Sequence, residues 1–290
     1  DYFNAGKVDS RLNWSSGNDF YVSEPDENGD INGAVDFHNW YWHQPSENRN
    51  NQGLEIDNSS GTIFVSTDYG TTEVINSEKT FGTRADDIIT GSEIDEKFIP
   101  NGGNDIINGG TGDDQFENIY LFQTRLTITD YESYEEIEFE DASWEQLYYN
   151  FSKENIENQF SVRYDSQLDN TYVSISTDSI TKDDLVVLNN GDFELSHYSL
   201  EDNLTGLEIF LKDENASNKD WYYIGDDVDV FGIKDFVSGD KLIFDGDFEF
   251  DSQNYADQIS SVFNENQNQT FINLNTDNFS KDGIAVIDGN

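Results

Sequence analysis

Acidic residues recur at intervals of nine in one part of the chain, and a large apolar residue follows two positions after each of them. The acidic residues are Asp87, Glu96, Asp105 and Asp114, and the apolar residues are Ile89, Phe98, Ile107 and Phe116. Glycines in the same stretch, which includes "NGGNDIINGGTGDDQF" (101–116), permit left-handed backbone and let main-chain carbonyl groups converge. Carboxylate and carbonyl oxygens are the ligands that Ca²⁺ prefers. The stretch therefore predicts oxygen ligands for a hard divalent cation.

The short period indicates how the chain must position these oxygens. A coil of this length cannot bury its apolar side chain alone, so successive coils must stack with their apolar residues pointing inward. The composition agrees with cation binding, because 60 Asp and Glu residues against 15 Lys and Arg residues give a formal net charge of -45, and the mean hydropathy is -0.71. A bare polypeptide of this composition lies near the disordered range. We therefore expect that cations must neutralise the carboxylates before the chain folds.

Four consecutive nonapeptides resemble the calcium-binding repeats of the RTX (repeats-in-toxin) family, whose consensus is G-G-x-G-x-D-x-U-x with U a large apolar residue. The four are "GTRADDIIT" (82–90), "GSEIDEKFI" (91–99), "PNGGNDIIN" (100–108) and "GGTGDDQFE" (109–117). The resemblance implies a short parallel β-roll and export by type I secretion. The segments "ITDYESYEEIEF" (128–139) and "IKDFVSGDKLIF" (233–244) also look like those that follow such repeats in exported proteins.

The resemblance also implies where ions would bind. In the family the turns alternate between two sides of the roll, so Asp87 and Asp105 would share one site, and Glu96 and Asp114 would lie on the opposite side. Main-chain carbonyl groups near Gly103 and Gly112 would complete the two sets of ligands. The second repeat departs from the consensus at Ile94 and at Glu96, so we expect Asp105→Ala to weaken calcium binding more than Glu96→Ala.

The composition also limits the compartment and the partners. A chain this negative repels phosphates and anionic lipid headgroups, which argues against nucleic acid partners and against membrane insertion. There is no Cys to form disulfides, and no run of about 18 apolar residues that would span a bilayer. The chain begins at Asp1 and lacks Met, so we expect a mature or excised product that is secreted and is extracellular or bound to a cell surface.

A second internal repeat predicts the organisation of the rest. "TYVSISTDSITKDDLVVLNNG" (171–191) aligns without a gap with "TFINLNTDNFSKDGIAVIDGN" (270–290), and both copies indicate strand, turn and strand. We expect an all-β fold in which the roll is flanked by antiparallel β-sandwich-like units. Apolar spacing also suggests amphipathic helices over 143–151 and 255–263. The expected parts are an N-terminal β domain (1–80), the roll with a first β unit (82–200), a connecting segment (201–220) and a related second unit (221–290).

Two further segments are candidate calcium loops. Asp26, Asn28 and Asp30 alternate as in an EF-hand loop, but the sixth position lacks Gly and the twelfth lacks Glu, so a polar turn is the favoured interpretation. In "GDDVD" (225–229), Asp226, Asp227 and Asp229 are either a chelating group or a solvated turn. The sequence does not decide between these alternatives.

The run "FHNWYWHQP" (37–45) is the most unusual apolar segment. Trp40 and Trp42 share one face of a strand, either as a platform for a glycan or surface partner or as part of a buried strand. The sequence has no Cys, no G-x-S-x-G motif and no H-E-x-x-H motif. Carboxylates are too abundant for a glycosidase pair to be located. We therefore expect no enzymatic activity.

The combined expectation is a secreted, calcium-binding structural or adhesive protein of a cell surface, such as a matrix or filament subunit. The second β unit has no counterpart to "DFELSHYSLEDNLTGLEIF" (192–210), so an uncovered edge or face is expected there. Self-association into an oligomer or filament would cover it. The alternatives are a non-catalytic export and folding module of a secreted enzyme, or a glycan-binding module.

Overall fold

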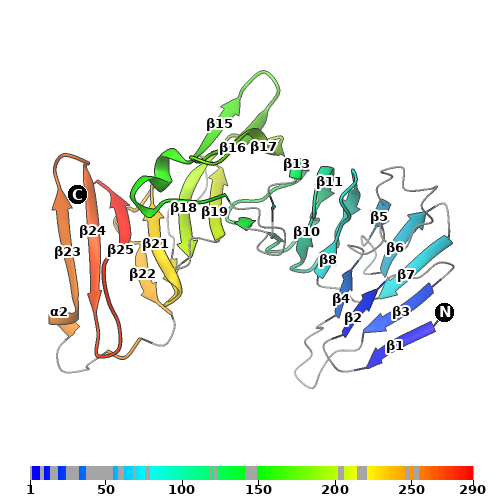
Figure 1. The fold of residues 1–290 in the computed structure, drawn as a ribbon, viewed down its shortest axis with the longest axis horizontal. Helices are drawn as coiled ribbons and strands as arrows, with labels where there is room; N and C mark the ends of the chain where they lie inside the picture. The colour runs from blue at the N-terminus through cyan, green and yellow to red at the C-terminus, as the bar shows by residue number, and fades with distance from the viewer. Residues whose placement is uncertain are drawn as a thin grey trace.

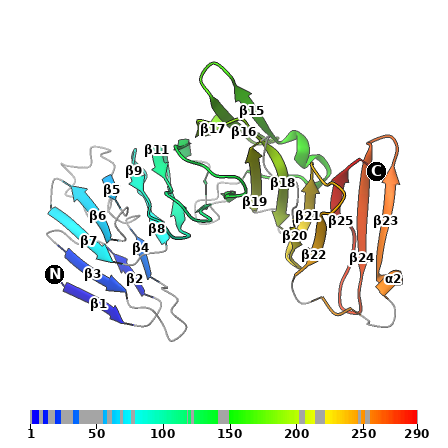
Figure 2. The ribbon, with the colours of Figure 1, turned by 180° about the vertical axis from the view of Figure 1, so that it is seen from behind.

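The computed structural model shows an almost entirely β protein built from two long sheets (Figures 1 and 2). It describes residues 2–6, 10–13, 19–23, 33–36, 55–57, 62–67, 70–75, 79–117, 119–120, 123–140, 149–201, 206–213, 221–245, 248–250 and 255–289. Within these ranges, helical structure is confined to the 3-10 helix η2 (Lys153–Asn158) and the short helix α2 (Tyr255–Gln258). The all-β fold class is confirmed. No helix in the described ranges is long and apolar enough to cross a bilayer.

The first sheet has the strand order β1-β3-β7-β6-β5-β9-β11-β13-β17-β16-β15. Its N-terminal strands are β1 (Tyr2–Gly6), β3 (Asp19–Ser23), β5 (Glu55–Asp57), β6 (Thr62–Thr67) and β7 (Gly70–Ile75). The others are β9 (Ile88–Thr90), β11 (Gly103–Asn108), β13 (Gln123–Ile128), β15 (Phe160–Asp165), β16 (Asn170–Ser176) and β17 (Thr181–Asn189).

The second sheet has the order β2-β4-β8-β10-β12-β14-β19-β18-β21-β25-β24-β23. Its first six strands are β2 (Ser10–Asn13), β4 (Gly33–Asp36), β8 (Lys79–Phe81), β10 (Lys97–Ile99), β12 (Gln115–Phe116) and β14 (Glu136–Glu140). The others are β18 (Phe193–Glu201), β19 (Gly206–Asp213), β21 (Val228–Ile233), β23 (Ile259–Asn264), β24 (Gln269–Asn275) and β25 (Ser280–Asp288). A separate small sheet pairs β20 (Trp221–Ile224) with β22 (Lys241–Phe244).

Successive nonapeptides alternate between the two long sheets. Strands β9 and β11 pair in parallel in the first sheet, with Ile88 opposite Ile106, and β10 and β12 pair in parallel in the second, with Lys97 opposite Gln115. Each strand therefore hydrogen-bonds to the strand two repeats away, which is the arrangement of stacked coils. The predicted parallel β-roll is confirmed.

The apolar residues of the repeats fill the space between the sheets. Ile89, Phe98, Ile107 and Phe116 are all buried. The rings of Phe98 and Phe116, which lie in neighbouring coils of the second sheet, are stacked with centroids 5.7 Å apart. The period of nine therefore marks an inward-facing column, as the sequence predicts.

The strands of residues 1–80 join the same two sheets. Strand β5 pairs in parallel with β9, and β4 pairs in parallel with β8. The sheets are thus continuous across the start of the repeats at Gly82.

The two copies of the longer repeat form matching strands. Strands β15, β16 and β17 of the first copy have the same lengths and spacing as β23, β24 and β25 of the second. Each set is an antiparallel three-stranded arrangement, and its last strand pairs in parallel with one further strand, β13 in the first copy and β21 in the second. The antiparallel pairing of β18 with β21 joins the two copies.

One sequence-based expectation is wrong in detail, and the structure adds a strand to another segment. The helix expected over 255–263 is only α2, because 259–264 forms strand β23 and pairs along its whole length with β24. The pairing partner overrides an apolar spacing that also fits a helix. Residues 206–213, expected in the connecting segment, form β19, whose Leu207, Ile209 and Leu211 are buried. The helix expected over 143–151 falls mainly on residues outside the described ranges.

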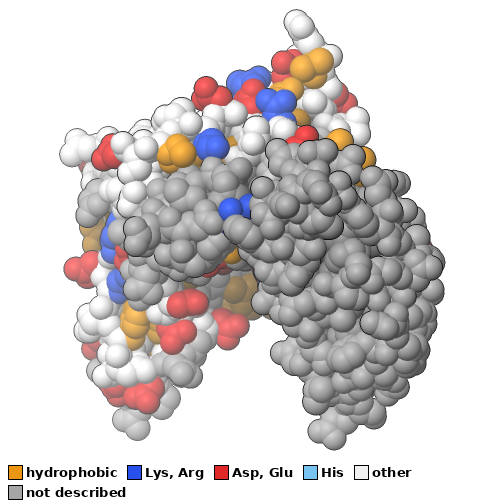
Figure 3. Space-filling model, turned by 45° about the vertical axis from the view of Figure 1, so that its right-hand side comes forward, with side chains coloured by type: hydrophobic (Ala, Val, Ile, Leu, Met, Phe, Trp, Pro, Cys, Tyr) orange, Lys and Arg blue, Asp and Glu red, His pale blue; other side chains and the backbone are white. Residues whose placement is uncertain are grey.

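Acidic side chains are spread over the described part of the face shown in Figure 3, interspersed with basic ones. Several of the bases are already engaged in ion pairs. Lys79 and Lys97 both contact Glu117, at 2.7 and 2.6 Å, across adjacent strands of the second sheet. These exposed or half-exposed pairs contribute little stability each.

Candidate metal centre

Asp87 and Asp105 lie on one side of the roll, in coils that stack directly on each other. The main-chain N–H of Asp87 donates a hydrogen bond of 2.7 Å to Oδ1 of Asp105. The carboxylate of Asp87 accepts hydrogen bonds from the N–H and the hydroxyl of Thr83, at 2.5 and 3.0 Å for Oδ2. Both acids are only 1% exposed. The structure therefore brings together the first pair of acids singled out from the sequence.

Glu96 and Asp114 form the equivalent pair on the opposite side. The N–H of Glu96 donates to Oδ1 of Asp114 at 2.9 Å, and the N–H and hydroxyl of Ser92 donate to Oε2 of Glu96 at 2.5 and 2.9 Å. Ser92 and Glu96 thus repeat the contacts of Thr83 and Asp87. The longer side chain of Glu96 is accommodated in the same turn geometry, although the repeat departs from the consensus there.

Glycines hold the turns of stacked coils in close contact. Gly103 has a φ of 105° and Gly112 a φ of 141°, a range that other residues rarely adopt. A Cβ at Gly103 would lie 2.5 Å from the carbonyl oxygen of Ala85, and a Cβ at Gly112 would lie 2.7 Å from that of Ile94. Main-chain carbonyl groups of one coil therefore lie against the glycine of the coil stacked on it.

We expect Gly112→Ala to lower the free energy of unfolding by at least about 3 kcal/mol. Backbone strain alone costs about 1–3 kcal/mol, and the added Cβ would also collide with the carbonyl group of Ile94. The matched control is Gly239→Ala, since Gly239 also has a positive φ, of 121°, but a Cβ there would meet no atom within 4 Å. Urea unfolding in excess calcium measures both variants. Equal losses of stability would show that the contact with the Ile94 carbonyl group contributes nothing.

Gln123 ends the ladder of acids on the first side. Its Nε2 donates to Oδ2 of Asp105 at 2.8 Å and to the main-chain oxygens of Gly103 and Arg125 at 3.1 and 2.9 Å. An amide thus takes the place of the next acid in the ladder. Sequence reasoning missed Gln123, although it follows Asp105 by the same interval of 18 residues that separates Asp105 from Asp87.

Glu135 occupies the corresponding position on the second side. It is 5% exposed, and the next residue, Glu136, donates its N–H to the main-chain oxygen of Asp114 at 3.2 Å. The Oε2 of Glu135 accepts a hydrogen bond from the N–H of Glu132 at 2.8 Å. No signal in the sequence marks Glu135, because it lies outside the nonapeptides and breaks their period.

Burial dominates the electrostatics of these acids. It raises the pKa of Asp105 to about 9, and the neighbouring Asp87 adds to the effect, although hydrogen bonds from Gln123 and from the Asp87 main chain oppose it. Burial also raises the pKa of Asp114 to about 7, with Glu96 and other carboxylates adding to it. The pKa of Glu135 rises to about 8 for the same reasons, with Asp114 as its strongest acidic neighbour. The fold therefore disfavours the ionised form of each acid.

The donors on the second side fit a hard cation. Oδ2 of Asp114 is buried and has no hydrogen-bond partner, and a buried oxygen without a partner is costly unless a cation or proton satisfies it. Within the described ranges, no three His, Cys, Asp or Glu side chains converge closely enough to bind one ion. A cation at Asp114 would therefore take main-chain carbonyl oxygens in addition to carboxylates, which is a donor set that Ca²⁺ accepts.

The structure describes only some of the other candidate residues predicted from the sequence. Asp229 forms ion pairs of 2.9 Å with Lys153 and with Lys281, and these hold its pKa below the ordinary value. Two ammonium groups already neutralise this carboxylate, which favours the solvated turn over a chelating group formed with Asp226 and Asp227. The candidate loop residues Asp26, Asn28 and Asp30, and the tryptophans Trp40 and Trp42, lie outside the described ranges.

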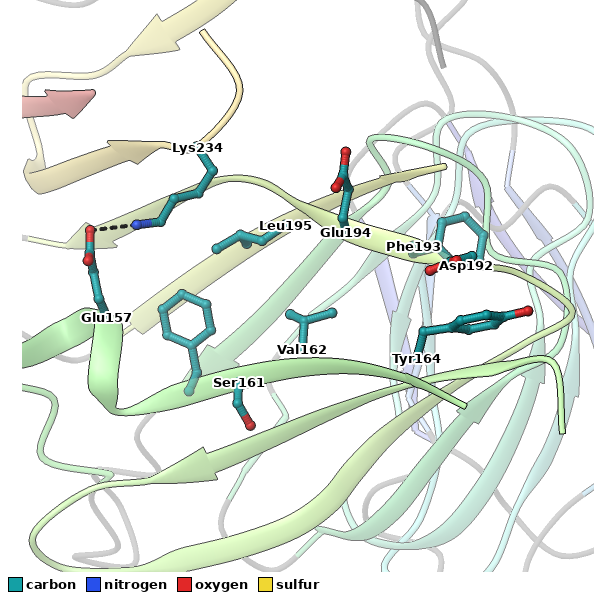
Figure 4. A pocket seen from close by; sticks show the side chains of 10 residues that line it. Glu157, Ser161, Val162, Tyr164, Asp192, Phe193, Glu194, Leu195 and Lys234 are labelled. Carbon is teal, nitrogen blue, oxygen red and sulfur yellow. Dashed lines mark hydrogen bonds and ion pairs between the residues drawn. The ribbon is translucent and has the colours of Figure 1, made fainter. Parts of the chain in front are cut away.

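A cavity of about 470 Å³ lies away from the acids, between β15 and β18. Figure 4 shows Val162 and Tyr164 of β15 facing Leu195 and its neighbours on β18, with the 2.8 Å ion pair between Glu157 and Lys234 at one end. None of the acids of the roll lines this cavity. The candidate metal centre is thus formed by the turns between coils and not by a cleft.

Comparison of the chain with models of known protein families and with curated proteins finds no match. The candidate site is therefore defined by the placement of the acids of the roll in the fold.

Proposed function

We propose that this chain is a secreted, calcium-binding structural or adhesive protein of a cell surface, and that its β-roll folds when calcium binds. One observation carries the proposal: buried acids stack in two ladders on opposite sides of the roll, and Oδ2 of Asp114 has no protein partner. The charged groups that perturb Asp105 and Asp114 are all carboxylates. A cation is the natural neutralising group for such an arrangement.

The proposed mechanism couples folding to ion binding. Without calcium, the ionised carboxylates of a chain with a net charge of -45 repel one another and destabilise the compact fold. Extracellular calcium-binding modules have dissociation constants of about 10⁻⁴–10⁻³ M, which suits a protein that folds only after export. Because an ion that binds only the folded state contributes its binding energy to folding, calcium would close the coils outside the cell. The resemblance of the nonapeptides to RTX repeats supports this proposal.

We expect Asp114→Asn to weaken calcium binding by at least the roughly 10- to 100-fold that loss of a supporting partner costs at metal sites. The amide keeps an oxygen acceptor for the Glu96 N–H but removes the negative charge and replaces the unpartnered oxygen. The matched control is Asp113→Asn, which makes the same change of charge at an exposed neighbouring residue. Isothermal titration calorimetry with calcium measures the affinity of both variants.

The outcomes separate the proposal from general charge effects. Loss of affinity in Asp114→Asn alone supports a site at this ladder. Equal affinities in the wild type and both variants would refute it, and equal losses in both variants would indicate diffuse attraction of calcium to an acidic surface.

A further inference from the structure

The two copies of the longer repeat differ in the strands that pair with β14 in the first copy and with its counterpart β22 in the second. In the first copy, β14 pairs in parallel with β12 on one side and antiparallel with β19 on the other. In the second copy, β22 corresponds to β14 and pairs in parallel with β20. Within the described ranges, no strand pairs with the other edge of β22. Figures 1 and 2 show β22 in the C-terminal half of the molecule.

Burial differs between the copies in the same way. Ile137 and Phe139 of β14 are 0% exposed, whereas the corresponding Leu242 and Phe244 of β22 are only half-buried. Within the described ranges, the antiparallel partner that β19 supplies to β14 thus has no counterpart at β22.

A group of aromatic side chains is left incompletely covered beside β22. This phenylalanine cluster consists of Phe236, Phe244, Phe248, Phe250 and Phe279. All five are half-buried and pack against the buried apolar residues of the C-terminal half, here called the C-terminal core. Phe248 contacts Phe244 and Phe279, with ring centroids 5.8 and 5.1 Å apart. An ordered but incompletely buried aromatic group of this kind is typical of a binding surface.

The main chain of β22 is oriented for a further strand. The N–H of Asp245 bonds to the carbonyl oxygen of Ile224 on β20 at 3.0 Å. Successive residues of a strand direct their main-chain groups to opposite edges, so the groups of Leu242 and Phe244 point away from β20. Leu242 and Phe244 also contribute side chains to the C-terminal core. The edge therefore offers hydrogen-bonding groups and apolar contacts together.

We propose that the free edge of β22 binds an extended segment of another polypeptide, which adds as an antiparallel strand with apolar side chains at alternate positions over the phenylalanine cluster. Strand addition to an exposed edge is an established way of recognising peptides. The charge pattern permits this, because β22 carries no Asp or Glu in a chain with 60 acids, and its one Lys, Lys241, lies over the ring of Trp221 on β20.

The first copy supplies the template for this partner. There, Ile209 and Leu207 of β19 lie opposite Ile137 and Phe139 of β14. A strand with the β19 pattern would place the same two residue types opposite Leu242 and Phe244. The β19 strand of a second copy is not available for this role, because β14 and β18 already pair with both of its edges.

The test uses the whole protein in millimolar calcium and a labelled peptide of residues 205–212, "TGLEIFLK", whose one acid and one base give it no net charge. We expect saturable one-to-one binding by fluorescence anisotropy. Leu242→Pro should weaken binding at least about tenfold, because it removes the N–H that faces the free edge, a place where proline is tolerated in a sheet. The matched control, Leu242→Val, keeps that N–H and should bind as the wild type does.

A peptide with Ile209→Pro leaves the protein unchanged and should not bind, so the proposal remains testable if Leu242→Pro fails to fold. Equal binding of both peptides, or no saturable binding of the unmodified one, would overturn the proposal. If the protein alone gains mass with concentration and Leu242→Pro prevents this, a second copy fills the edge and the assignment to another polypeptide is wrong. The proposal does not rest on calcium binding by the roll, so a fold that is insensitive to calcium would leave it standing.

Discussion

In the presence of a chelator, we expect the melting temperature of this protein to fall as the pH rises from about 5.5 to 9, and in millimolar calcium we expect it to stay nearly constant. The cause is burial of Asp114, Glu135 and Asp105, whose pKa values in the fold are raised to about 7, 8 and 9. In the unfolded chain such carboxyl groups have pKa values of about 4.

The sign of the effect follows from linkage. A carboxyl group whose pKa is higher in the fold stabilises the fold fully below about pH 4, and this contribution is lost as the pH rises through the folded-state pKa. The loss begins above about pH 4 for all three groups and is complete near pH 7 for Asp114, near 8 for Glu135 and near 9 for Asp105. Calcium replaces the protons as the neutralising charge, so it should abolish the slope.

Differential scanning calorimetry across this pH range, with and without chelator, measures the effect. A difference of several kcal/mol corresponds to a fall of about 5–10 °C for a domain of this size. Asp114→Asn should reduce the slope in chelator, because the amide does not ionise. A melting temperature that is independent of pH in chelator, or that falls equally in calcium, would contradict the proposed exchange of protons for calcium.

Phe116→Ala is expected to cost about 3–5 kcal/mol of unfolding free energy, the usual range for removing a buried aromatic ring. Phe116 is 0% exposed, and its ring lies against Phe98 at 5.7 Å and Tyr131 at 6.5 Å, measured between centroids. It therefore joins the last nonapeptide to the segment that follows. Its loss would open a cavity at the point where the roll meets the first β unit.

Urea unfolding in excess calcium measures this cost without a change in ion occupancy. The matched control is Ile106→Ala in β11, which removes an apolar side chain that is 44% exposed and should change stability by less than about 0.5 kcal/mol. A loss below about 1 kcal/mol for Phe116→Ala would mean that the column of apolar residues does not hold the coils together.

The column of apolar residues and the alternation of coils could be predicted because one short period governs both. Every ninth residue from Ile89 to Phe116 had to face inward, and all four are buried in the structure. The matching strands of the longer repeat were likewise visible as an ungapped alignment. These features depend on local pattern, which the sequence contains in full.

The ends of the ladders depend on tertiary contacts instead. Gln123 and Glu135 lie next to the acids because β13 and β14 continue the two sheets beyond the repeats, and residue type alone did not distinguish them. The misassigned 259–264 segment shows the same limit, since Ile259 and Val262 fit a helix by spacing but belong to a strand that pairs with β24. The spacing of apolar residues can be read from a segment alone, but the strand that will pair with that segment cannot.

Strands β1 and β23 lie at opposite ends of the longest axis of the molecule, and the strands of the roll run across that axis (Figure 1). A force applied along this axis would break the hydrogen bonds between neighbouring coils one row after another. It would not act on many rows at the same time. Each coil of 18 residues that separates would release about 60 Å of extended chain. Calcium ions bound between coils, as proposed above, would resist this separation. The force needed to extend the protein would then rise with the calcium concentration around it.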